Sequence, residues 1–205
     1  MRESKSPCTL TSLRSRPMEI TETFYPSDRL QWRAWLEANF ESRDDIWLMV
    51  PLKASGEQGV SYNDSVEEAL CFGWIDSTAK AFDEGHQVRR FTRRRKGSPY
   101  SQLNIERLKR MDSLGLIHPS IRPSIEEILN RAFVFPKDIL DEIRRDETAW
   151  ANYLSFSEAY KRIRIAYIDD ARDRPAEFKK RLASFLRKTR ENKLITGYGG
   201  TDQYY

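Results

Sequence analysis

Residues 61–80 read SYNDSVEEALCFGWIDSTAK, and residues 86–106 read HQVRRFTRRRKGSPYSQLNIE. In the first stretch, apolar or small residues recur at Val66, Ala69, Leu70, Gly73 and Trp74. This spacing places them on one face of a helix. We therefore expect a helix with a buried face to lead directly into the next element of the fold.

The chain then changes from a helical to an extended pattern. Residues 75–82 and 87–93 are typical of two β-strands, and the polar residues 83–86 between them form a connection of hairpin length. The sequence thus predicts a β-hairpin immediately after the buried helix.

The second predicted strand begins a basic ribbon, which we define as Arg89, Arg90, Arg93, Arg94, Arg95 and Lys96. From His86 to Arg110 there are nine Lys or Arg residues and one acid, a local charge of +8 in a chain of net charge +4. Positive charge is therefore concentrated in this part of the chain, where it favours an anionic ligand.

Residues 97–101 form a turn that leads into a helix capped by Ser98 or Ser101. A helix start presents unpaired N–H donors and a positive dipole end, so flanking arginines make it a natural anion site. The candidate anion-binding residues are Arg89, Arg93, Arg94, Arg95, Lys96, Ser98 and Ser101, with Trp74 or Tyr100 available for stacking. The alternative is that the ribbon is a solvated strand edge whose cations prevent pairing with other chains.

Candidates for catalysis are sparse. Asp76 lies close in sequence to the arginines, where it would orient a guanidinium or act as a base, or simply cap a turn. A nucleophilic Cys71 would need His86 or His118 within hydrogen-bond reach, but its apolar surroundings favour a packed thiol. With two histidines and no Cys/His cluster, we expect no metal site, and no motif indicates a cofactor.

The element pattern predicts an α+β protein with a small, mostly antiparallel sheet packed with helices, followed by a helical C-terminal region. The expected divisions are a disordered leader at 1–22, an α+β domain at 23–132, a helical region at 133–195 and a flexible tail at 196–205. No apolar run reaches the length of a membrane span. Two cysteines give no disulfide framework, which favours a reducing compartment, the cytoplasm.

Several segments together resemble the YdeI/OmpD-associated family, also described as bacteriocin-protection proteins. They are EALCFGWIDS (68–77), RFTRRRKGSPYSQLNIERL (90–108), FPKDILDEIRRD (135–146) and LSFSEAYKRIRIAYIDDAR (154–172), and the likeness extends from Phe24 to Ile195. It implies a bacterial protein linked to tolerance of antimicrobial peptides or envelope stress. Two departures are Arg93, where the family usually has proline, and ARDRPAEFKKRL (171–182), which replaces a Lys-rich segment.

We therefore expect a non-catalytic, cytosolic anion-binding or interaction protein, whose ligand is a small anion or a phosphate-containing molecule. The alternative is an enzyme acting on a phosphorylated or carboxylated small molecule, with Asp76 beside the arginines. Nucleic acid is a weaker expectation, because only Phe91 and Tyr100 interleave with the cations. Direct capture of cationic peptides is disfavoured by like charge.

Overall fold

The computed structural model describes residues 19–52, 54–196 and 204. Most of the expected leader, residues 1–18, and most of the expected tail, residues 197–203 and 205, lie outside this part. The described residues form a four-stranded sheet in the order β1-β2-β4-β3. Its strands are β1 (Thr23–Phe24), β2 (Asp45–Pro51), β3 (Trp74–Ala81) and β4 (His86–Arg93).

The helices of the described residues fall into two groups along the chain. The first comprises α1 (Arg29–Asn39), α2 (Tyr62–Cys71), α3 (Gln102–Ser113) and α4 (Arg122–Asn130). The second comprises α5 (Lys137–Arg144), α6 (Glu147–Ser155), α7 (Glu158–Asp169) and α8 (Pro175–Arg190). The expected α+β class is therefore confirmed.

The sheet is mostly antiparallel, as predicted. Strands β3 and β4 form the expected hairpin, and β4 also pairs antiparallel with β2, whereas β1 pairs parallel with β2. The register between β3 and β4 shifts between Asp76 and Ala79, which marks a bulge in β3. Because β4 lies between two partners, the interpretation of the basic ribbon as a strand edge is wrong.

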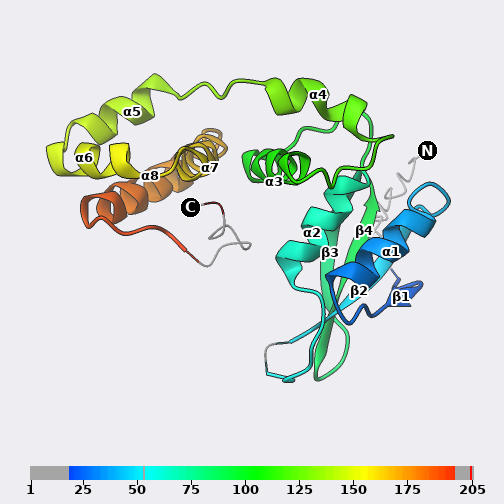
Figure 1. Ribbon diagram of the computed structural model, residues 1–205. Coiled ribbons are helices and arrows are strands. Elements are labelled where there is room, and N and C mark those ends of the chain that lie inside the picture. Colours follow the sequence, from blue (N-terminus) through cyan, green and yellow to red (C-terminus); the bar gives the residue numbers. More distant parts are fainter. Residues whose placement is uncertain (1–18, 53, 197–203, 205) are drawn as a thin grey trace, which may run out of the picture.

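One face of the sheet is covered by α1 and α2, as Figure 1 shows. Trp32 and Leu36 of α1 pack with Leu70 of α2 and with Leu48 and Phe91 of the sheet. Large buried aromatic and aliphatic side chains of this kind supply most of the free energy of folding. The hydrophobic face predicted for residues 66–74 therefore forms part of this first core.

Gly73 allows the chain to reverse between α2 and β3. It has a φ of +72°, in the left-handed region that side chains disfavour, and an added Cβ would lie 3.1 Å from Cδ1 of Ile121. The helix-to-strand transition seen in the sequence thus requires glycine at this position.

A second hydrophobic cluster holds the later helices together. Ile139 and Ile143 of α5 pack with Tyr153 of α6, Tyr160 of α7 and Phe185 of α8. In Figure 1 these helices form a group beside α3, which lies between them and the sheet. The first cluster extends to Leu129 and the second begins with Phe133, close to the division predicted between residues 132 and 133; the proposed domain limits stay a prediction.

A buried ion pair joins the two groups of helices. Arg162 of α7 donates to both carboxylate oxygens of Glu106 on α3, at 2.7 and 2.9 Å, and Gln102 donates to the same carboxylate at 2.7 Å. Glu106 is only 5% exposed. This geometry fixes α3 against α7 and thereby shapes the surface between the two groups.

None of the helices in the described part of the chain is long and apolar enough to cross a membrane.

Candidate functional site: a basic corner beside a groove

The cations of the ribbon do not converge on one site, because side chains alternate along a strand. Arg89 is in register with Leu48, on the face covered by α2, whereas Arg90 is in register with Trp47 on the opposite face. There Arg90 donates to Asp45 at 2.7 Å through Nε. Neighbouring arginines of β4 therefore neutralise different carboxylates on different faces of the sheet.

Asp76 holds Arg89 in place. Arg89 Nη1 donates to Asp76 Oδ2 at 2.9 Å, and the Tyr62 hydroxyl donates to the same oxygen at 3.2 Å. The Arg89 guanidinium also lies 4.3 Å from the centre of the Tyr62 ring. Burial, together with the charge of Asp76, raises the pKa of Tyr62. These contacts show Asp76 orienting a guanidinium, one of the roles considered for it.

Arg93 and Arg94, at the end of β4, are held mainly by main-chain carbonyl groups. Arg93 donates to the carbonyls of Arg43 and Glu41 at 2.7 and 2.6 Å, and the nearest carboxylate oxygen, of the exposed Asp44, is 3.6 Å away. Arg94 donates to the carbonyls of Ser98 and Pro99 and lies 3.7 Å from the centre of the Tyr100 ring. Carbonyl groups orient a guanidinium without cancelling its charge.

The next two cations face solvent. Arg95 and Lys96 are exposed and make no ion pair or side-chain hydrogen bond with any residue of the described ranges. The turn then closes at Gly97, and Ser101 caps α3 by accepting a hydrogen bond from the Asn104 N–H. We call the segment from Arg93 to Lys96 the basic corner.

A groove of about 800 Å³ begins beside the basic corner. Tyr100, on which Arg94 stacks, and the cap Ser101 both line it. Its apolar lining includes Leu103 of α3, Phe133 of the connection after α4, and Ile163 of α7. Three arginines and two aspartates also line it, so its own charge is nearly balanced: Arg131, Arg164, Arg181, Asp169 and Asp170.

Two different family models match the parts of the chain on either side of this groove. Residues 132–192 match the family model described as Bacteriocin-protection, YdeI or OmpD-Associated. Residues 24–123 match a separate model, a domain of unknown function (DUF8412). No curated protein and no solved structure matches the chain. The expected family resemblance is thus shown for the C-terminal segment, while the CFGWIDS and arginine-rich segments lie within the other match.

The groove is formed between these two matched segments. Tyr100 to Ile105 come from the first, and Phe133 together with side chains of α7 and α8 comes from the YdeI/OmpD-associated segment. Ligand sites form preferentially where two such units meet. The junction therefore has the geometry of a binding site that neither segment forms alone.

The predicted site residues are only partly brought together. The basic corner includes Arg93, Arg94, Arg95 and Lys96, and Ser101 and Tyr100 lie next to it, but Arg89 is bound to Asp76 instead. Ser98 contributes its carbonyl, not a helix cap. Trp74 is fully buried and donates to the Phe40 carbonyl at 3.2 Å, so its ring is not accessible for stacking.

Cys71 lacks the features of a nucleophile. Burial, followed by the charge of Glu68, raises the pKa of its thiol to about 12. His118 Nδ1 lies 2.8 Å from the Ser120 hydroxyl, and His86 forms contacts with Asp83 and Glu57 in the hairpin region. The thiol is therefore protonated at neutral pH, and thiolate chemistry is not supported.

Sequence reasoning missed a buried charged cluster on α2. Glu67 and Glu68 are almost fully enclosed, and Arg29 donates to them at 2.9 and 2.5 Å. Arg33 donates to Glu68 at 2.7 Å. Two adjacent glutamates inside the apolar run SVEEALCF were a usable signal, because buried carboxylates require cationic partners.

Tyr204 completes this cluster from the far end of the chain. Its hydroxyl donates to Glu67, and its ring lies 5.7 Å from the Arg110 guanidinium. Burial and the contact with Glu67 raise the pKa of the Tyr204 phenol. No local pattern in the sequence indicated this contact, because 137 positions separate the two residues.

Among the described residues, no group of three or more His, Cys, Asp or Glu side chains is arranged to hold a metal ion.

Proposed function

We propose that this protein is a non-catalytic binding protein for an anion that carries an apolar chain, acting in the tolerance of antimicrobial peptides. The match of residues 132–192 to the bacteriocin-protection family supports the biological setting. The free thiol of Cys71 fits a reducing compartment, so we place the protein in the cytoplasm.

The basic corner carries this proposal. Carbonyl groups and the Tyr100 ring hold Arg93 and Arg94 rigidly, and Arg95 and Lys96 extend beside them into solvent. Cations fixed in advance bind an anion at a smaller entropic cost than mobile ones. The adjacent N-terminus of α3 adds a favourable dipole.

The groove accounts for the apolar part of the ligand. Because its own charges nearly balance, it contributes little selectivity for charge, and Leu103, Phe133 and Ile163 give it apolar walls. A ligand with its anionic group at the basic corner would place an attached chain in this groove. A phosphate monoester of a medium-length alcohol has this chemistry.

Binding is better supported than catalysis. The alternative enzyme would place its substrate at Asp76, but Asp76 lines neither the groove nor the cavity between α7 and α8. The carboxylate is already engaged by Arg89 and Tyr62. A substrate would have to displace both contacts to reach it.

Calorimetry with n-octyl phosphate, inorganic phosphate and n-octanol tests the proposal. We expect saturable binding of octyl phosphate that is tighter than that of either fragment. The double variant R95Q/K96Q should bind roughly 30-fold more weakly at low salt, since each of the two lost contacts is worth on the order of 1 kcal/mol. The control R174Q/K179Q removes the same charge at exposed positions elsewhere.

If R95Q/K96Q and R174Q/K179Q weaken octyl phosphate binding equally, the attraction depends only on the net charge of the protein, and the proposal is contradicted. Failure of all three ligands to bind would do the same. Binding of an RNA oligomer with steep salt dependence, in the absence of octyl phosphate binding, would replace this ligand class with a polyanion.

A further inference from the structure

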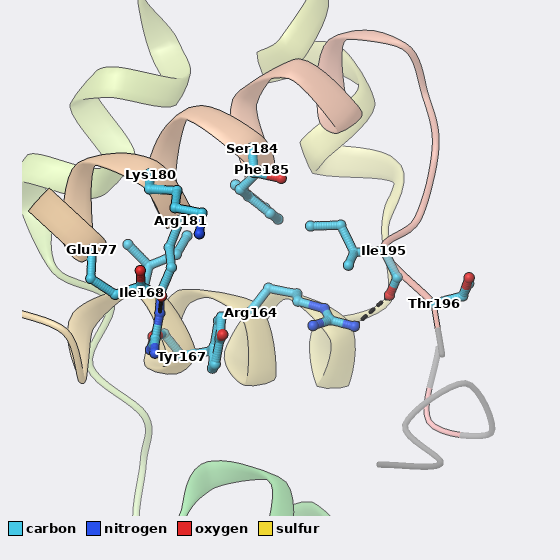
Figure 2. Close-up of a pocket in the computed structure, with 10 residues that line it drawn as sticks. All are labelled: Arg164, Tyr167, Ile168, Glu177, Lys180, Arg181, Ser184, Phe185, Ile195 and Thr196. Atoms are coloured by element: carbon cyan, nitrogen blue, oxygen red, sulfur yellow. Dashed lines mark hydrogen bonds and ion pairs between the residues drawn. The ribbon is translucent and has the colours of Figure 1, made fainter. Parts of the chain in front are cut away.

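A second cavity lies between α7, α8 and the segment that follows α8, and that segment lies just beyond the residues matched to the YdeI/OmpD-associated family. Its volume is about 360 Å³, which is within the range of small-molecule sites. Figure 2 shows Phe185 and Ile195 pointing toward one another across it, with Arg164 running below them. The ring of Tyr167 and the side chain of Ile168 add further apolar surface.

Arg164 supplies a cationic group that is already largely withdrawn from water. The residue is only 4% exposed, and its guanidinium donates to the Ile195 carbonyl at the edge of the cavity. The planar guanidinium matches the two oxygens of a carboxylate in geometry. An anion beside it would interact in a medium of low polarity, where charge–charge attraction is strong.

Lys180 adds a second cation at the rim. Figure 2 shows its side chain directed toward the cavity from α8, opposite Ile195. The hydrogen bond from Arg181 lowers the pKa of Glu177, and the nearby charge of Lys180 lowers it further. Because the Lys180 side chain is exposed, its ammonium group can still reach an anion that enters between α8 and the following segment.

The other two charged residues that line the cavity, Arg181 and Glu177, pair with each other. Arg181 donates to Glu177 at 2.9 Å and to the Tyr167 carbonyl at 2.6 Å, and its guanidinium lies 3.8 Å from the centre of the Tyr167 ring. This pairing offsets the charge of Arg181, but the Glu177 carboxylate still lines the cavity. An anion beside Glu177 would be repelled, so a ligand carboxylate would lie toward Arg164 and Lys180.

We propose that this cavity is a second binding site, for a carboxylate with a compact apolar body, with Arg164 and Lys180 contacting the carboxylate. The Phe185 and Ile195 side chains would enclose the apolar body. The site differs from the groove in the elements that enclose it, although Arg164, Tyr167 and Arg181 line both cavities. It does not require the basic corner.

Benzoate, benzamide and phenyl phosphate form a matched set of probes, followed by calorimetry and by the methyl resonances of the isoleucines. We expect benzoate to bind most tightly and to shift the Ile168 and Ile195 signals. K180Q should weaken benzoate binding roughly five- to tenfold, whereas K179Q, at the neighbouring exposed position, should leave it unchanged.

Two further variants distinguish binding in this cavity from binding at the basic corner. S184W places a large ring at the exposed rim position of Ser184 and should abolish benzoate binding without lowering the melting temperature. R95Q/K96Q should leave benzoate affinity unchanged. The proposal fails if benzamide or phenyl phosphate binds as tightly as benzoate, if K180Q matches K179Q, or if benzoate does not bind.

Discussion

Removal of the Arg162 side chain tests how firmly the two groups of helices are joined. In an R162M variant, Glu106 would lose both guanidinium contacts and keep only the hydrogen bond from Gln102. Breaking a fully buried pair costs about 3–5 kcal/mol, because the remaining charge stays desolvated. Since the Arg162 side chain is 23% exposed, water relieves part of this cost, and we expect a loss of about 2–3 kcal/mol.

Urea denaturation followed by circular dichroism measures this loss as a change in the free energy of unfolding. The control is R172M, which removes an arginine that also contacts two carboxylates, Asp138 and Asp169, but on an exposed surface. We expect the control to cost less than about 1 kcal/mol. The double variant E106M/R162M should recover most of the stability, because apolar side chains replace the buried pair.

An R162M variant no less stable than R172M would refute this reasoning. It would mean that the ion pair in the junction contributes no more than an exposed one. A double variant as unstable as R162M would refute the second part, namely that the cost arises from the uncompensated Glu106 carboxylate.

Three further predictions concern single side chains. The protonated His86 ring donates hydrogen bonds to Asp83 and Glu57, and these bonds raise its pKa above 6.5. Its contribution to stability is therefore complete below pH 6.5 and is lost as pH rises through the raised pKa, so the melting temperatures of wild type and H86Q should converge at high pH. A C8S variant keeps Cys71 as its one thiol, and the pKa of that thiol is about 12. We therefore expect Cys71 to react with a disulfide reagent at pH 8 only after the protein is unfolded, and reaction in the native state would contradict its burial. Y204F removes the phenol that donates to Glu67 and should cost about 1–3 kcal/mol in urea denaturation, whereas an unchanged midpoint would show that this contact adds nothing.

The sequence was most informative where local periodicity controls structure. The buried face from Val66 to Trp74 and the following hairpin are present as expected, because helical and strand patterns depend on near neighbours. The strand order was not predictable in the same way. Pairing of β4 with β2 links residues that are 35 (Pro51 and His86) to 47 (Asp45 and Thr92) positions apart, and that pairing is what makes β4 an interior strand.

The candidate site shows the same limit. A run of cations indicated positive charge near residues 89–96, but not that Arg89 and Arg90 would be paired on opposite faces. The walls of the groove come from segments as distant as Tyr100 and Phe133, which no sequence spacing connects. Of the expected cluster, only the basic corner and the start of α3 form one surface.

The two outer strands of the sheet affect how copies of this protein associate. β1 contains only two residues, and the register shift between Asp76 and Ala79 interrupts β3. Joining two sheets edge to edge requires a longer, regular row of main-chain donors and acceptors. We therefore expect the folded protein to resist fibril formation through its sheet, and any self-association to proceed through its helices.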